Sequence, residues 1–523
     1  MACGGSSSSG NNTPKLSGAS LESVVNYESG PVRPLAISAD NKRLFVTNTP
    51  SNTLEIYSIN ADDSLALTGT VTVGVDPVAV AVRSENEVWV VNHVSDSVSV
   101  VRLDGSPRVL RTLQVGDEPR DIVFAGQDKN LAFITAASRG QNKPGFTSDK
   151  LLESGLGRAD VWVFDASDLD DSLNGKPLAV LTLNSDIPRA LAVNADGSKV
   201  YAAAFHSGNG TTTLHRDVVN PRGLDTTLNT FNKLLFNLKP LSPASADNKA
   251  APDTSLIVRK NSAGKWVDEN GQDLSSKVKF DFADDDVFVI DANAVTPAVT
   301  DTKYAGVGTT LFNMVFSNNK LFVSNTESLN EVRFEGSGAK SKGTVKGHMI
   351  DSRITVIDTS SNSVTPVNLN SHLSFPTDNG VVSADKKAKT MSQPTAMVSS
   401  SDGSVVYVAG FGSGKIAALP VSALNNSFQP DVNNQIAVPA GPAGLALNND
   451  GSRLYVYSRI DHKLSIIKTT EKTKVYELAM FTPERAHALA RRPHGFDQKV
   501  HRDLGRSLVQ RFQRFLCQPA WTR

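Results

Sequence analysis

A unit of about 40–50 residues recurs seven times along the 523-residue chain. Each copy has an apolar strand, a turn and two further apolar strands, and most copies begin at a proline. The copies begin at Pro34, Pro77, Pro119, Pro188, Leu311, Pro394 and Pro442. A four-stranded unit of this size has two apolar faces that it cannot cover alone, so neighbouring units stack radially until a ring closes. The repeats therefore predict an all-β fold, a seven-bladed β-propeller.

Three of the predicted blades are longer than the others. The extra residues are 139–159, 206–284 and 327–350, and each set lies between the second and third strands of its blade, in blades 3, 4 and 5. The same connection in consecutive blades must emerge on the same side of the disc. Insertions on one face of a repeat protein often build its binding surface. We therefore expect a binding face formed by the insertions of blades 3–5; the alternative is a roof that shields a sheet edge.

Composition and motif searches remove several function classes. The chain has 53 basic and 53 acidic residues and no run of about 18 apolar residues, so neither whole-chain nucleic-acid binding nor a transmembrane helix is indicated. Its two cysteines, Cys3 and Cys517, exclude a disulfide framework, a four-cysteine zinc site and an iron–sulfur cluster. Phosphate-binding glycine loops, zinc-protease motifs and the serine-hydrolase elbow do not occur. We assign no catalytic and no metal-binding residue.

The densest group of chemically active side chains lies in the blade-5 insertion. Glu331, Arg333 and His348 belong to it, Arg353 follows directly, and His206 opens the neighbouring insertion of blade 4. We take these five residues as the candidate ligand- or partner-binding site, because charged side chains on long loops often contact other molecules. The alternative is that they pair with one another on the surface, where ion pairs contribute little.

Two further polar patterns have simpler structural explanations. Asp284–Asp286 is an acidic run without the spacing of a calcium loop, and we expect it to be a solvated entry to the next strand. Asn48, Asn92 and Asn325 recur at the ends of second strands, where we expect their side chains to cap turns.

Two sets of residues resemble known families. Leu44-Phe-Val-Thr-Asn48 and Val88-Trp-Val-Val-Asn92 resemble the YVTN family of 40-residue β-propeller repeats, which is found in bacterial and archaeal surface and envelope proteins. In blade 5, Ser324–Gly336, Gly347-His348 and Ser352–Asp358 together resemble a group of bacterial envelope propellers. In that group the propeller is often followed by a c-type cytochrome domain similar to di-haem peroxidases.

The second resemblance implies haem c only for a further C-terminal domain. The Cys-x-x-Cys-His attachment motif of such a domain is missing from this sequence, so we expect no cofactor in the sequence as it stands. The resemblance to YVTN repeats covers about residues 30–480.

The two ends differ from the propeller, which we place at residues 30–484. Residues 1–29 are a Gly/Ser-rich tether, and Met1-Ala-Cys3-Gly-Gly resembles a bacterial lipoprotein just after its signal peptide. We expect lipidation at Cys3 and a periplasmic or outer-membrane-anchored protein, although no apolar signal region precedes the cysteine here; a chance cysteine is the alternative. Residues 485–523 hold nine basic and two acidic residues. We expect this tail to be non-native or loosely attached rather than a basic surface-binding helix or a histidine metal site.

Three function classes follow from these observations. The first is a non-catalytic binding or scaffold propeller of the bacterial cell envelope. The second is the front half of a haem-containing redox enzyme whose cytochrome domain is missing. The third is a lactonase-like propeller enzyme, which the fold alone cannot support. For the first class we expect a monomer whose partner is an unidentified protein or small molecule, with no nucleic acid and with membrane contact only through lipid at Cys3.

Overall fold

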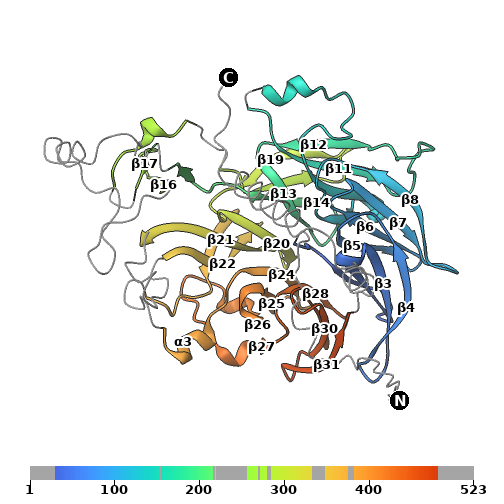
Figure 1. Ribbon diagram of the computed structural model, residues 1–523. Coiled ribbons are helices and arrows are strands. Elements are labelled where there is room, and N and C mark those ends of the chain that lie inside the picture. Colours follow the sequence, from blue (N-terminus) through green and yellow to red (C-terminus); the bar gives the residue numbers. More distant parts are fainter. Residues whose placement is uncertain are drawn as a thin grey trace, which may run out of the picture.

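The computed structural model describes residues 30–153, 155–215, 218, 256–268, 271–279, 284–332, 348–374 and 382–480. Cys3, Arg333, the tail 485–523 and most of 206–253 lie outside these residues. Within them, seven antiparallel blades of four strands each surround a common axis, and two of these blades are joined into one eight-stranded sheet (Figure 1). The predicted all-β, seven-bladed β-propeller is confirmed.

Every blade is built from consecutive strands, apart from one insertion. Blade 1 is β1 (Leu35–Ile37), β2 (Arg43–Asn48), β3 (Thr53–Ile59) and β4 (Leu65–Thr72); blade 2 is β5 (Pro77–Ser84), β6 (Glu87–Asn92), β7 (Ser97–Arg102) and β8 (Arg108–Gln114). Blade 3 is β9 (Ile122–Ala125), β10 (Leu131–Ala137), β11 (Ala159–Asp165) and β12 (Ala179–Leu183); blade 4 is β13 (Asp186–Val193), β14 (Lys199–His206), β18 (Val287–Asp291) and β19 (Ala298–Tyr304). Blade 4 thus matches the predicted order, with its third strand far along the chain.

The remaining blades follow the same pattern. Blade 5 is β20 (Thr310–Ser317), β21 (Lys320–Val332), β22 (His348–Asp358) and β23 (Ser363–Asn368); blade 6 is β24 (Pro394–Ser399), β25 (Val405–Gly410), β26 (Lys415–Pro420) and β27 (Gln435–Ala437). Blade 7 is β28 (Pro442–Leu447), β29 (Arg453–Ser458), β30 (Lys463–Lys468) and β31 (Thr473–Ala479). A single pairing of His206 with Thr310 joins the sheets of blades 4 and 5.

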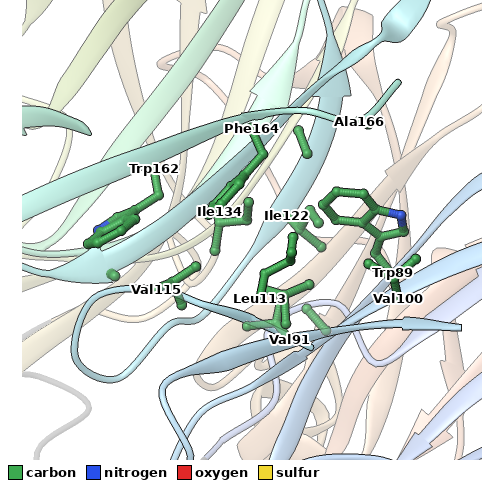
Figure 2. Close-up of a cluster of buried hydrophobic side chains, with 14 of the residues drawn as sticks. Trp89, Val91, Val100, Leu113, Val115, Ile122, Ile134, Trp162, Phe164 and Ala166 are labelled. Atoms are coloured by element: carbon green, nitrogen blue, oxygen red, sulfur yellow. The ribbon is translucent and has the colours of Figure 1, made fainter. Parts of the chain in front are cut away.

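Burial explains why these segments form strands of different character. The second strand β6 is buried along nearly its whole length, because both faces of its blade are covered by neighbouring blades. The outermost strand β8 alternates exposed and less exposed residues, since one of its faces meets solvent. Between blades 2 and 3, Trp89, Leu113, Ile122, Trp162 and Phe164 form one shared apolar cluster (Figure 2). Neighbouring blades therefore share their cores, as the repeat argument requires.

Among residues 30–480 as described, side chains close the ring, and each strand of the first and last blades comes from its own repeat. Tyr57 of β3 and Tyr457 of β29 lie in one buried cluster across the junction of blades 1 and 7. The Arg453 guanidinium of blade 7 pairs with the Asp63 carboxylate of blade 1, with Nε 2.7 Å from Oδ1. Apolar packing and an ion pair thus hold the first and last blades together.

Strand direction divides the connections between two faces of the disc. We call "insertion face" the side that carries the connections from second to third strands and from each blade to the next. The opposite face carries the other turns. The three predicted insertions start from the insertion face, as expected. The blade-5 insertion differs from its prediction as a loop, because β21 and β22 continue as a hairpin whose arms pair Ser328 with Ile350 and Val332 with His348.

The blade-4 insertion contains a small sheet of its own. It consists of β15 (Thr211–Leu214), β16 (Leu256–Lys260) and β17 (Trp266–Val267), seen beside the ends of β21 and β22 in Figure 1. Leu214, Val258, Trp266 and Leu274 form its small core. Across the described part of the chain, no helix is long and apolar enough to cross a membrane.

Candidate functional site

The structure separates the five residues of the predicted binding site. His206 ends β14 with its side chain about half exposed, and its Nδ1 lies 3.7 Å from Asp186 Oδ2. Arg353 lies in β22 and is mostly buried. Glu331 and His348 fall in β21 and β22, but their side chains, like Arg333 as a whole, lie outside the described residues. Only His206 and Arg353 can therefore be placed by their contacts.

Arg353 belongs to an ion-pair network around the buried carboxylate of Glu327. Glu327 Oε2 lies 3.1 Å from Arg353 Nη2 and accepts a hydrogen bond of 2.7 Å from Asn209 Nδ2. Its Oε1 lies 2.7 Å from Arg259 Nη2. Asn209 and Arg259 belong to the blade-4 insertion, whereas Glu327 and Arg353 belong to blade 5. The carboxylate therefore fixes the small insertion sheet to the neighbouring blade.

Arg353 is held in place by further acceptors. Its Nε donates to Asn325 Oδ1 at 3.2 Å and its Nη2 donates to the Val307 carbonyl at 2.8 Å. Burial lowers the pKa of Arg353, and the charge of Glu327 opposes that shift. With its donors used inside the chain, Arg353 acts in the structure as a positioning residue for the insertion.

The blade-3 insertion is anchored to its own blade. Lys143 Nζ lies 2.9 Å from the buried carboxylate of Asp160 and donates to Thr182 Oγ1 at 2.7 Å. Arg139, at the start of the same insertion, pairs with Asp117 at 2.9 Å. These contacts fold the insertion down onto the rim of blade 3.

A short segment before β1 closes the central channel at the insertion face. The Val32 amide donates to the Val78 carbonyl of blade 2, and the Val32 carbonyl accepts from Asn313 of blade 5. Arg33 reaches Asp121 of blade 3 and the Leu191 carbonyl of blade 4. Residues 30–33 thus contact four blades at once and lie across the axis of the ring.

A group of cationic and aromatic side chains surrounds this closed channel end. We call His93, Arg120, Arg189 and Phe205 the mouth cluster. The Arg189 guanidinium carbon lies 4.8 Å from the centre of the Phe205 ring, and that of Arg120 lies 5.6 Å from it. Arg189 is 7% exposed and donates to the backbone carbonyls of Phe312 and Pro31. His93 Nδ1 lies 3.1 Å from the Pro119 carbonyl oxygen.

The mouth cluster is short of negative charge. Burial, followed by the nearby charge of Arg120, lowers the pKa of Arg189 to about 9. Burial and the same charge lower the pKa of His93 to about 4, so its ring is neutral at pH 7. Glu118 is the carboxylate that pairs with Arg120, at 3.1 Å. Burial is thus the larger cause of both pKa shifts, and the charge of Arg120 adds to each of them.

Sequence reasoning missed the mouth cluster, although a signal for it exists. Arg120 and Arg189 each follow the proline that begins a repeat, Pro119 and Pro188, whereas the corresponding residue is Val78 in blade 2. In a propeller this position opens the innermost strand and therefore lines the axis. An arginine there in two consecutive repeats indicates a positively charged channel mouth.

The opposite end of the channel has a different character. There the innermost strands of blades 1–5 line an open funnel of about 420 Å³ with mostly apolar residues, among them the partly exposed Ile37, Ala81, Phe124 and Phe316. Arg33 forms part of its floor. The segment 30–33 therefore separates a polar mouth on one face from an apolar funnel on the other.

The acidic run 284–286 does not form the solvated entry that was expected. Asp286 is fully buried, and its Oδ2 accepts a hydrogen bond of 2.6 Å from the Val307 amide. Burial raises the pKa of Asp286 to about 7. The prediction is wrong for this residue because the blade-4 insertion contacts the strand entry: Asp284, two residues before it, accepts a hydrogen bond from the Gly210 amide.

The recurring asparagines also act differently from the prediction. Asn92 Nδ2 donates to Ser97 and Ser99 of the third strand, and Asn325 Nδ2 donates to Thr355 of the third strand in blade 5. Asn48 Nδ2 likewise donates to Glu55 at 2.5 Å. These buried side chains tie the second strand of a blade to its third strand rather than capping a turn.

Covalent attachment of haem c has no support among the propeller's side chains. Thioether attachment requires two cysteines and a histidine in Cys-x-x-Cys-His, and the only cysteines of the chain, Cys3 and Cys517, lie outside the described residues. We therefore derive no chemical step through a haem group.

Comparison with known proteins supports the fold and leaves the ligand open. The family model "Lactonase, 7-bladed beta-propeller" matches residues 11–120, and no curated protein matches the chain. Among solved structures, hydrazine synthase from Kuenenia stuttgartiensis is similar, with a TM-score of 0.52, 16% identity, and coverage of 85% of this chain and 97% of that chain. Apo AztD from Citrobacter koseri has a TM-score of 0.41, 12% identity and 86% coverage of each chain. At such identities the likeness concerns the β-propeller fold alone.

Proposed function

We propose that this chain is a non-catalytic binding propeller of the bacterial cell envelope whose binding face is formed by the insertions of blades 3–5. The observation that carries the proposal is the network around Glu327, which joins Arg259 of the blade-4 insertion to Arg353 of blade 5. A loop without a function has no need of ion pairs to a buried carboxylate, because holding two such segments in one geometry costs conformational entropy. A surface that is fixed in this way is suited to recognising a partner.

The blade-3 insertion supports the same proposal. Lys143 anchors it to the buried Asp160 of its own blade, and it rises from the same face as the other two insertions. His206 is exposed between the insertion sheet and the channel mouth, so it is available to a partner. In this proposal Glu331, Arg333 and His348 contribute contacts from the β21–β22 hairpin, and Arg353 positions them.

A site-specific photocrosslinking experiment in living cells tests the binding face. A photoreactive residue is placed at Ile350, which is 61% exposed in the blade-5 hairpin, and, as the matched control, at Val295, a fully exposed position on the opposite face. We expect covalent adducts from position 350 and none from position 295. Equal adducts from both positions, or none from either, would overturn the proposal.

The envelope location rests on Cys3 and has its own test. We propose that this cysteine carries a lipid and that membrane contact occurs only through it. When the chain is exported behind a lipoprotein signal peptide, a labelled fatty acid should be incorporated, and Cys3→Ser should abolish the label. Cys517→Ser is the matched control and should label like the parent chain. Incorporation that persists in Cys3→Ser contradicts the anchor.

A further inference from the structure

The mouth cluster places two guanidinium groups against one aromatic ring. The guanidinium carbons of Arg120 and Arg189 lie 5.6 and 4.8 Å from the Phe205 ring centre. A cation over an aromatic ring is attracted to its face, but two like charges held close to the same ring repel each other. The ring alone therefore offsets only part of the cost of bringing these two cations together.

The hydrogen-bond partners of Arg120 and Arg189 carry too little negative charge to balance both guanidinium groups. Arg189 donates to the carbonyls of Phe312 and Pro31, which are neutral acceptors. Arg120 pairs with Glu118, and its buried Nε has no hydrogen-bond partner within the residues that the structure describes. The nearby carboxylate of Asp121 is already paired with Arg33. Arg120 thus shares the carboxylate of Glu118 with Arg139, which lies 3.8 Å from it, and the hydrogen bonds of Arg189 described above go to neutral carbonyls. Such an arrangement of buried cations is costly unless another anion completes it.

We infer that the mouth cluster binds a small ligand through a carboxylate or phosphate group seated between Arg120 and Arg189. The planar, forked donors of arginine match the oxygens of either group, which makes arginine pairs well suited to oxyanions. The inference rests on the proposed function only in placing the ligand on the insertion face. It names the chemical class of one ligand, at the axis of the ring.

The residues around the mouth cluster determine from which side a ligand enters and which ligand shape fits. Residues 30–33 close the channel beneath the cluster, so the ligand enters from the insertion face. Phe205 meets Phe312 edge to face, with ring centres 6.0 Å apart. These rings provide an apolar wall beside the oxyanion position, where a flat apolar group next to the anion can pack. An aromatic carboxylate therefore combines both features of the site.

The test uses the full chain and two defined anions. Sodium phosphate and sodium benzoate are titrated at constant ionic strength, with chloride as the balancing anion, and binding is followed by calorimetry and by the melting temperature. We expect saturable binding of at least one anion, and at least tenfold weaker binding in Arg120→Gln. The matched control is Arg43→Gln, which removes an arginine lying over Phe45 on the opposite face at 5.7 Å and should leave binding unchanged.

A second variant distinguishes the two anions and keeps the inference testable if Arg120→Gln does not fold. Phe205→Leu keeps both arginines, and it should weaken benzoate binding more than phosphate binding. Absence of saturable binding by the parent chain, or unchanged binding in both Arg120→Gln and Phe205→Leu, would overturn the inference. Because the titration needs no partner, its failure would leave the crosslinking result at Ile350 intact, and the reverse also holds.

Discussion

The Arg33 guanidinium reaches across the axis of the ring to the Asp121 carboxylate, with Nε 3.1 Å from Oδ1 and Nη2 3.1 Å from Oδ2. Asp121 is fully buried and also accepts hydrogen bonds from the amides of Ile122 and Leu191. This bidentate pair fixes the segment before blade 1 to blades 3 and 4, so it contributes to holding the ring together as well as to closing its channel.

Removing the arginine of this pair should destabilise the protein strongly. Arg33→Met leaves the Asp121 carboxylate buried without its counter-charge, and we expect a loss of about 3 kcal/mol in the free energy of unfolding, at the low end for a broken buried pair because two amides still bond to it. Urea unfolding measures the effect. Arg43→Met, which breaks the more exposed pair with Glu85, should cost less than about 1 kcal/mol. Equal losses in the two variants would contradict this account of the channel segment.

The Glu327 network should control the mobility of the insertion sheet. Glu327→Gln removes the charge that binds Arg259 and Arg353, so we expect the amides of β16 to exchange with deuterium at least tenfold faster, while those of the blade-1 strands keep their rates. Hydrogen-exchange mass spectrometry gives the comparison. Glu477→Gln breaks an ion pair with Lys463 in the outer strands of blade 7 and serves as the control. Unchanged exchange in β16 would show that the sheet is held by other contacts.

Asp286 should make the protein less stable as the pH rises. Its folded-state pKa of about 7 lies above the ordinary aspartate pKa of 3.8, so the folded state binds more protons between these values, and the free energy of unfolding falls from about pH 4 to about pH 7. Asp286→Asn should remove that decrease, and the variant should exceed the parent at pH 8 by roughly 2–4 kcal/mol, since one pKa unit corresponds to about 1.4 kcal/mol. Denaturant unfolding at pH 5 and pH 8 decides the matter. A gap between variant and parent that is the same at both pH values would refute the assignment.

His93 should make the protein less stable as the pH falls, which is the opposite of the effect expected for Asp286. Its folded-state pKa is lowered from 6.5 to about 4, so the stability gained from the neutral ring is present above pH 6.5 and is lost as the pH falls through 4. His93→Gln should therefore lose less stability than the parent between pH 7 and pH 4.5. The same buffers and unfolding assay apply, with the exposed His206→Gln as control. A His93 ring that titrates near pH 6.5 by NMR would contradict the expected burial effect.

Local sequence patterns were sufficient for the architecture and insufficient for the mouth cluster. The blades follow from apolar strands repeated at nearly constant spacing, and the shared face of the insertions follows from their common place within the repeat. The residues of the mouth cluster meet because three different repeats converge on one axis, and the spacing of the repeats does not show which side chains lie at that axis. The proline–arginine pairs at Pro119 and Pro188 were the available clue, and they become meaningful only once the ring is known.

The burial of individual polar side chains could not be predicted from the sequence either. The pattern around Asp286 is that of any acidic turn, and only the fold brings Ser207 and the Val307 amide to this buried carboxyl as hydrogen-bond partners. Asn92 was expected to cap a turn because asparagine commonly does so. Its actual partners, Ser97 and Ser99, lie across the strand pair, where alternation within the strand places them on the same side.

The position of Gly30 has a consequence for how the disc would sit on a membrane. Gly30 lies near the axis of the ring on the insertion face. An anchor upstream of Gly30 is therefore attached to the centre of that face rather than to its edge. If Cys3 carries a lipid, as proposed, 27 positions of sequence separate that lipid from Gly30. The plane of the disc would then lie parallel to the membrane. The mouth cluster and the insertions would face the bilayer, and the apolar funnel would face away from it. Ligands would be captured in the thin layer between protein and membrane.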